Sequence, residues 1–292
     1  EDGIRDQPRS RGLGDVYKSQ ALVARAIGSG NSFEAIDPPS ECYIEYDDLL
    51  NNKPLNNLEG LLVVKNVLSH DSIDSLRSEY FSMFGGDYEY DGSDWTHVKS
   101  SKLSHGVGSH PANTFVRSKL FCDFIESSVL NNLAAVLLHS DQSFLCPRVI
   151  LRSFSHLSSR CTLAHRDRDY FKTSDNSKAL TAWIPLGPVD SYHGQLVYLK
   201  DSHKNIPTIT KLVRDDRTIA SDLKGLADNL ETTWYLPKVS KGDVVFHCLN
   251  IVHASFNTNN LIPRLSCDLR FASSTEYLDP KWSNYWRGDD GL

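Results

Sequence analysis

The second half of the chain is a succession of short segments rich in β-branched and aromatic residues, and this pattern restricts the fold more than any other feature. Turn residues separate the segments, which is typical of strands rather than of helices. Strands this short and this regularly spaced predict a sandwich or barrel. The six segments span 148–154, 179–186, 195–199, 243–246, 251–255 and 264–271.

Helical patterns are more common before these strands. An apolar run at 60–68 predicts a strand, and apolar residues at spacings of three and four predict a helix after it that ends at Gly85-Gly86. A second helical region is predicted over 111–138, and a helix inserted between strands over 219–230. We therefore expect a mainly β fold with flanking helices (α+β).

Length and charge narrow the class of protein. With 292 residues, of which 40% are hydrophobic, the chain can bury a sizeable core. We expect a single domain over 60–292, with 1–59 as an N-terminal extension packed on it or flanking it. The formal charge of −6 argues against nucleic acid or a membrane surface as the main partner, and no apolar stretch reaches the ~18 residues of a membrane span. A monomer or a homodimer is expected.

Six cysteines are scattered along the chain without a C-x-x-C pair, which argues against zinc-knuckle and redox motifs. Free thiols in a reducing compartment are the simplest interpretation, and no N-x-S/T acceptor for glycosylation occurs. These observations predict a cytoplasmic protein. The chain opens at Glu1 without a visible signal peptide, so organellar targeting by a removed upstream segment stays an alternative.

Side chains that suit a metal lie in two places of the strand-rich half. His165 and Asp167 are two residues apart, so both can point to one face at a strand end, and His253 lies in another apolar strand. Two imidazoles and one carboxylate suit Fe(II) in a non-haem oxygenase and leave the opposite face of the metal open. Taken singly, each residue has a simpler interpretation, as part of a solvated loop or as a core histidine.

Arg264 follows inside an apolar strand. A buried guanidinium needs a partner, because an unpaired buried charge costs several kcal/mol, and a carboxylate held bidentately would be one. Ser266 lies on the same strand face and can add a hydroxyl donor. The pair predicts a site for a dicarboxylate co-substrate, although a surface cation is the simpler interpretation of Arg264 alone.

These residues and their neighbours resemble the phytanoyl-CoA hydroxylase-like (PhyH) family of Fe(II)/2-oxoglutarate oxygenases. The similarity covers about 144–273 and 60–84. The motifs that carry it are HRDRDYF at 165–171, Thr181-Ala182-Trp183-Ile184, His193-Gly194-Gln195-Leu196 continuing to Ser202-His203, Gly242-Asp243, Phe246-His247, His253 and Arg264.

The resemblance implies a double-stranded β-helix (jelly-roll, cupin-like) core. It implies that Fe(II) is bound by His165, Asp167 and His253, and that 2-oxoglutarate and O2 are co-substrates. The residues expected at 2-oxoglutarate are Arg264, for its distal carboxylate, and Ser266, Thr181 and Trp183.

Two positions depart from the family pattern. Lys200-Asp201 replaces Pro-Gly, which alters a turn, and Arg166 replaces the usual Gln between the ligands, where its side chain is expected to point away from the metal. Asp167 is present, whereas halogenating relatives lack this carboxylate. Oxygenation or another C–H oxidation is therefore expected.

The expected function is that of an Fe(II)/2-oxoglutarate-dependent dioxygenase of specialised metabolism. It would oxidise a C–H bond of a small, polar, carboxylated metabolite, by hydroxylation, desaturation or oxidative cyclisation, and release succinate and CO2. The alternatives are a non-catalytic jelly-roll that serves as a binding module, and an oxygenase of protein side chains.

The candidate residues for the substrate site are chosen from the alternation of side chains along a strand and from their position after the metal motif. Arg148 and Arg152 share one strand face, which either lines the barrel or faces solvent. His105 lies in the aperiodic segment 85–110, which is either a lid or a surface loop. Tyr170 and Phe171 follow the metal motif and either shape the pocket or belong to the core.

Overall fold

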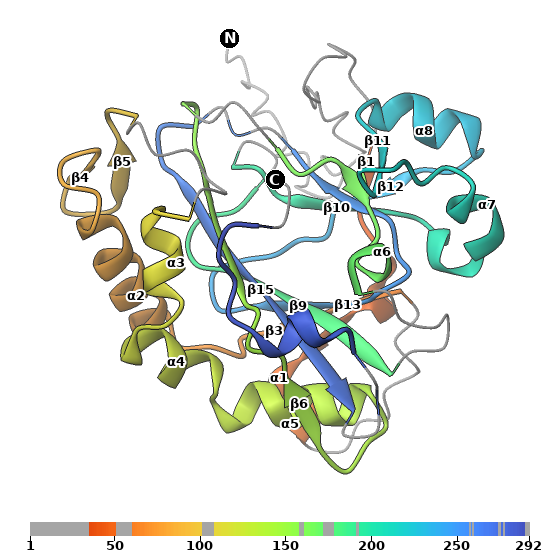
Figure 1. Ribbon diagram of the computed structural model, residues 1–292, viewed down its shortest axis with the longest axis horizontal. Helices are drawn as coiled ribbons and strands as arrows, with labels where there is room; N and C mark the ends of the chain where they lie inside the picture. Colours follow the sequence, from red (N-terminus) through yellow and green to blue (C-terminus); the bar gives the residue numbers. More distant parts are fainter. Residues whose placement is uncertain are drawn as a thin grey trace, which may run out of the picture.

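The structure, a computed structural model, describes residues 35–50, 60–100, 108–157, 161–171, 178–190, 193–256, 258, 260–273, 276 and 278–289. Two β-sheets face each other at its centre (Figure 1). Their inner faces share a buried cluster, in which Val63 and Val245 of the larger sheet pack with Leu196 and Tyr198 of the smaller one.

Both sheets combine strands that lie far apart in the sequence. The larger sheet has the order β2 (Tyr43–Glu45), β3 (Leu61–Lys65), β13 (Val244–Cys248), β9 (Ala179–Pro185), β15 (Arg264–Ser273) and β6 (Ser143–Leu145), and β7 (Ile150–Phe154) also pairs with β15. The smaller sheet has the order β1 (Ala35–Ile36), β12 (Trp234–Tyr235), β10 (Leu196–Leu199), β14 (His253–Ser255), β8 (Ala164–His165) and β11 (Thr218–Ala220). A separate hairpin joins β4 (Tyr88–Tyr90) to β5 (Trp95–His97).

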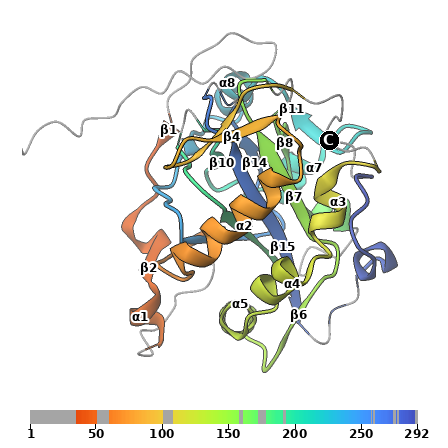
Figure 2. The ribbon, with the colours of Figure 1, turned by 90° about the vertical axis from the view of Figure 1, so that its left-hand side faces the viewer.

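Helices cover the outer faces of the two sheets. Figures 1 and 2 show α2 to α5 along one side of the larger sheet, and α7 and α8 lie beside the smaller sheet. The α-helices are α1 (Tyr46–Leu50), α2 (His70–Ser82), α3 (Pro111–Phe115), α4 (Lys119–Ile125), α5 (Ser128–Leu137), α6 (Arg168–Phe171), α7 (Ile206–Thr210) and α8 (Leu223–Asn229). The 3₁₀-helices are η1 (Ser40–Cys42), η2 (Ser202–Lys204) and η3 (Pro280–Ser283).

Alternation along β15 separates an apolar outer face from a polar inner face. Leu265, Leu269 and Phe271 join the core cluster that the helices α2 to α5 complete. The alternate residues Arg264, Ser266, Asp268 and Arg270 face the interior between the sheets, because successive side chains of a strand point to opposite faces. All ten residues of β15 are buried, so the interior contains charged groups that water does not reach freely.

The strand pattern predicted from the sequence is confirmed, since each of the six segments contains a strand. The helical region 111–138 is divided into three helices, because Ser118 caps α4 through a bond from the amide of Phe121 and α5 begins anew at Ser128. The stretch predicted as a helix over 219–230 begins instead with the end of β11 and becomes helical only in α8.

Two further segments are more ordered than the sequence suggested. Residues 35–50 contribute β1, parallel to β12, and β2, parallel to β3. The aperiodic stretch after α2 forms the β4–β5 hairpin, in which Tyr88 stacks on His97 at 4.4 Å between ring centroids.

Composition and packing disagree about one helical stretch. Lys119–Leu137 is long and apolar enough to cross a membrane by composition. The structure divides it into α4 and α5, and Phe121, Leu130 and Leu133 from these helices lie in the main core. All six cysteines lie in the described residues, and none of them forms a disulfide bond there.

Candidate active site

Three buried side chains converge at one end of the space between the sheets. His165 ends β8, Asp167 lies in the turn before α6, and His253 begins β14, directly opposite His165 in the register of the smaller sheet. One ligand atom from each lies within 4.8 Å of the other two. The sequence placed His165 and Asp167 on one strand end, and the structure shows that Asp167 has already left the strand.

Backbone carbonyls orient both imidazoles. His165 Nδ1 lies 2.8 Å from the carbonyl oxygen of Leu163, and His253 Nδ1 lies 3.2 Å from that of Ile251. A protonated Nδ1 in each ring leaves Nε2 as a lone-pair donor, and the two Nε2 atoms lie 3.6 and 3.8 Å from Asp167 Oδ1. Burial lowers the pKa of His253 well below its ordinary value, and the neighbouring His165 and His247 add to this effect. Neutral imidazoles are the form that binds a metal.

The two oxygens of Asp167 have different surroundings. Oδ1 faces the two Nε2 atoms, whereas Oδ2 accepts a hydrogen bond from the hydroxyl of Thr181 and lies 3.5 Å from His247 Nε2. Burial raises the pKa of Asp167, but the charge of Arg270 and the neighbouring side chains of His165 and His247 outweigh it and hold the pKa well below its usual range. The carboxylate is therefore ionised and directs one oxygen at the space between the imidazoles.

Arg264 and Ser266 present unsatisfied donors on the inner face of β15. Arg264 is 1% exposed, and its guanidinium donates from Nη1 to the carbonyl oxygen of Gly194 at 2.7 Å. Among the described residues, Nε of Arg264 and Oγ of Ser266 have no hydrogen-bond partner. Burial lowers the pKa of Arg264 to about 9, so the group is still a cation at pH 7. The donor set therefore fits a divalent metal and an anionic co-substrate.

The remaining residues expected at the co-substrate have other contacts. Thr181, on the inner face of β9, donates to Asp167 and so acts on the carboxylate. Trp183, two residues on, is buried in the apolar cluster between the sheets. Arg166 points away from the site as expected, because its guanidinium donates to Asp169 at 2.8 and 3.0 Å.

The candidates for the substrate site are separated by the structure. Arg152 faces the interior, opposite Ser266 in the register of β7 and β15, and donates to Asp268 at 2.7 Å. Tyr170 lies edge-on to the ring of His165 at 5.6 Å. These two remain near the converging ligands.

Two other candidates, Arg148 and Phe171, do not join this group. Arg148 precedes β7 and binds Asp289 near the C-terminus. Phe171 is fully buried and stacks on Trp282. Of the two alternatives given for Phe171, the structure therefore favours a place in the core. His105 lies outside the described residues.

Several residues near the site were not singled out from the sequence. His247, quoted only within a motif, is fully buried, with Nδ1 3.4 Å from the hydroxyl of Tyr198. Asp268 and Arg270 continue the alternation that had linked Arg264 to Ser266, and extending it by two steps would have found them. Arg217 lies over the ring of Tyr170 at 5.3 Å, and no sequence signal pointed to it.

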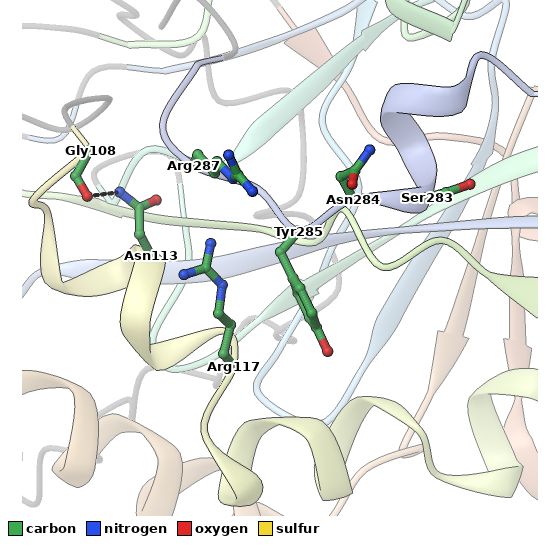
Figure 3. Close-up of a pocket in the computed structure, with 7 residues that line it drawn as sticks. All are labelled: Gly108, Asn113, Arg117, Ser283, Asn284, Tyr285 and Arg287. Carbon is green, nitrogen blue, oxygen red and sulfur yellow. Dashed lines mark hydrogen bonds between the residues drawn. The ribbon is translucent and has the colours of Figure 1, made fainter.

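One described cavity lies away from the converging side chains. It has a volume of about 560 Å³ and is formed between α3 and the C-terminal segment, as Figure 3 shows. Arg117, Tyr285 and Arg287 line it, and none of the converging ligands does. Its size alone therefore does not identify it as the reaction site, because the metal-binding donors lie inside the barrel.

Comparison with known proteins agrees with this geometry. Residues 57–265, well over half of the chain, match the family described as Phytanoyl-CoA dioxygenase (PhyH). No curated protein sequence matches the chain. The likeness extends to solved structures.

Three solved structures illustrate the likeness, which at their low identities shows the fold. The epimerase SnoN in complex with Fe3+, alpha ketoglutarate and nogalamycin RO is 18% identical over 76% of this chain and 82% of that one, with a TM-score of 0.55. EctD from S. alaskensis with bound Fe is 16% identical over 76% and 75%, with a TM-score of 0.53. The carbocyclase SnoK from nogalamycin biosynthesis is 19% identical over 76% and 83%, with a TM-score of 0.51.

The two facing sheets are thus the double-stranded β-helix that the resemblance to the family implied. The family match includes His165, Asp167, His253 and Arg264, the residues whose side chains the structure turns toward the interior. The chain belongs to the phytanoyl-CoA dioxygenase (PhyH) family and is a non-haem iron oxygenase that depends on 2-oxoglutarate and O2.

Proposed function

We propose that the protein oxidises a C–H bond of a small, anionic metabolite, with His165, Asp167 and His253 as the iron ligands. Arg264 and Ser266 would bind the distal carboxylate of 2-oxoglutarate. Iron, 2-oxoglutarate and O2 together supply the oxidant, and succinate and CO2 leave as products. The chain's own residues orient the reactants and exclude water.

One observation carries the assignment of the co-substrate site. A buried guanidinium with an unsatisfied Nε, beside an unsatisfied hydroxyl, is costly in a folded protein unless a ligand completes it. A carboxylate is the ligand that satisfies both donors at once. Arg264 and Ser266 lie on the same face of β15 as Arg270, whose guanidinium approaches Asp167. A dicarboxylate bound at Arg264 can therefore extend its other end along this face toward the proposed metal ligands.

The charges of the interior support an anionic substrate. The described inner wall holds the guanidinium groups of Arg152, Arg264 and Arg270 against the carboxylates of Asp167 and Asp268, which leaves one positive charge. A ferrous ion and the 2-oxoglutarate dianion cancel each other. The remaining charge favours a substrate with a single carboxylate or similar group.

Burial of the ligands supports a small molecule rather than a protein side chain. His165, Asp167 and His253 are only 3–6% exposed, so a substrate must enter the barrel to reach them. Tyr170 and Arg217, which lie on the side of His165, are the candidates for contacting it. Hydroxylation is the simplest reaction, and desaturation or oxidative ring closure would use the same site.

The test begins without oxygen. Fe(II) and 2-oxoglutarate added anaerobically should give a weak visible charge-transfer band, and this band should be absent in His165→Ala. His139→Ala, which removes an exposed histidine at the end of α5, is the matched control and should keep the band. A wild-type protein that gives no band would refute the metal assignment.

The substrate is sought by succinate release in air. A panel of monocarboxylated metabolites, matched with their amides or esters, should stimulate succinate release only in the acid form. Equal stimulation by acids and by their neutral derivatives would contradict the proposed substrate charge while leaving the metal site intact.

A further inference from the structure

Trp282, which follows β15 in the chain, packs against the helix that follows Asp167. Trp282, in η3, is 3% exposed, and its ring stacks on Phe171 with 3.9 Å between centroids and 8° between planes. Phe171 ends α6, whose amides bond back to Asp167: Phe171 N donates to the Asp167 carbonyl at 3.1 Å. The family match ends at residue 265, so Trp282 lies in a part of the chain that it does not include.

Trp282 is also surrounded by cations. Lys281 and Arg270 lie over its ring at 5.1 and 5.5 Å, and Arg148 lies at 5.9 Å. A cation over an indole face is attracted by the ring quadrupole, so the ring helps to hold each of these groups in place. Of the three, Arg270 is the one that the structure also places beside a proposed metal ligand.

Arg270 Nη2 lies 3.7 Å from Asp167 Oδ1, the oxygen that faces the imidazole Nε2 atoms. The guanidinium is 4% exposed and also donates from Nη1 to the carbonyl oxygen of Asp268 at 3.2 Å. A fixed charge a few ångströms from a ligand atom, in a site that excludes water, acts strongly because little solvent screens it. Thr181 donates a hydrogen bond to the other oxygen and His247 Nε2 lies 3.5 Å from it, so Arg270 is not required to orient the carboxylate.

We propose that Arg270, held in place by Trp282, favours the ferrous over the ferric state of the bound metal by keeping a positive charge beside the ligating oxygen of Asp167. When Fe(II) loses one electron to an external acceptor, the charge of the metal rises by one, and a neighbouring cation opposes that rise. The same repulsion weakens metal binding slightly. Arg270 and Trp282 are thus positioning residues that act on the metal through its carboxylate.

The inference rests on the proposed metal site, and its test separates the two. Wild-type protein and variants are loaded anaerobically with Fe(II), and the midpoint potential is measured by a mediated titration that follows the electron paramagnetic resonance of Fe(III). Arg270→Gln should shift the potential to lower values, and Arg270→Lys, which keeps the charge, should stay close to the wild type. Lys281→Gln removes a cation from the same indole ring without touching Asp167, and it should change nothing.

Metal affinity separates tuning from scaffolding. If Arg270 tunes the metal, Arg270→Gln should bind Fe(II) as tightly as the wild type or more tightly, because a repulsive charge has been removed. If Arg270 only supports the fold, Arg270→Gln should bind Fe(II) more weakly and keep its potential. That result, or an unchanged potential with metal bound, would overturn the inference.

Trp282 gives a second, independent readout. Trp282→Phe keeps a ring against Phe171 and should preserve the potential, whereas Trp282→Leu removes the support of the guanidinium and should lower it. Should Trp282→Leu fail to fold, the comparison of Arg270→Gln with Arg270→Lys still tests whether the charge sets the potential. Failure of wild-type protein to bind Fe(II) would instead refute the proposed metal site.

Discussion

Arg264 is held in the folded chain under conditions that are unfavourable for a cation. Its buried guanidinium donates a hydrogen bond to the carbonyl of Gly194, and its Nε is unsatisfied among the described residues. Replacement by methionine, of similar length and without charge, should stabilise the ligand-free protein by about 1–4 kcal/mol. If Arg264 binds the distal carboxylate as proposed, the same change should raise the KM for 2-oxoglutarate about 10- to 100-fold, since it removes the charged hydrogen bonds to that carboxylate.

The pH dependence of this effect has a definite sign. Burial lowers the pKa of Arg264 to about 9 in the folded state, below its ordinary value of 12.5. The destabilisation is therefore fully present below pH 9 and is lost as the pH rises from 9 toward 12.5, where the folded state has already released its proton. Urea unfolding of wild type and Arg264→Met at pH 7 and pH 10 should show a smaller difference at pH 10. A destabilised Arg264→Met at pH 7 would contradict the prediction.

Thr181 offers a sharper test of how the carboxylate is oriented. Thr181→Val keeps the shape of the side chain but removes the hydroxyl that donates to Asp167 Oδ2. Loss of such a contact behind a metal ligand should weaken Fe(II) binding about 10- to 100-fold. Thr181→Ser, which restores the donor, should recover most of the affinity in an anaerobic metal titration. Equal affinities for the Val and Ser variants would show that the hydroxyl does not matter.

Single residues differ in how far sequence reasoning could reach them. His165, Asp167 and His253 have a spacing that a metal site explains, and the structure brings them together. Alternation along β15 places Arg270 on the same strand face as Arg264, but its role could not be predicted from the sequence, because that role depends on which residue lies across the interior from it. That neighbour, Asp167, is more than a hundred positions away in the chain, and only the folded sheets bring the two side chains together.

At the scale of elements, α5 shows how a helix is attached to the sheet. Leu133 is 2% exposed and packs in the core cluster with residues of the larger sheet, whereas Val136 on the same helix is 50% exposed. Leu133→Ala should therefore destabilise the protein by about 2–5 kcal/mol through the cavity it leaves. Val136→Ala, the matched control, should change the free energy of unfolding by less than about 0.5 kcal/mol in urea titrations. Similar effects of the two changes would contradict the observed packing.

Length decides which elements the sequence could predict. β9 and β15 have seven and ten residues, and a β-rich pattern of that length is recognisable on its own. β8 and β12 have two residues each, and nothing within so short a stretch distinguishes a strand from a turn. Their partners in the smaller sheet determine them, as when His165 pairs with His253 across 88 positions. The sequence predicted that 111–138 is helical, but it did not predict that the stretch is divided into three helices, because residues that cap new helices lie inside it.

At the scale of the whole molecule, the two sheets contribute different parts of one site. His165 and His253 come from the smaller sheet, while Thr181, Arg264 and Arg270 come from the larger one. Ligands that contact both sheets should therefore stabilise the closed barrel as a unit. This coupling predicts how metal and co-substrate act together on stability.

Fe(II) and 2-oxoglutarate bind only the folded chain, so each at a hundred times its dissociation constant should add about 2.7 kcal/mol of stability. Anaerobic thermal unfolding of the wild type should show two increments, one for metal and a second for 2-oxoglutarate. Arg264→Met should keep the first increment and lose most of the second, because its metal ligands are unchanged. Asp167→Ala should lose both, since the co-substrate needs the metal as its second anchor. A 2-oxoglutarate increment that survives in Arg264→Met would mean that another cation of the interior holds the distal carboxylate, and Arg152, opposite Ser266, would be the first residue to exchange.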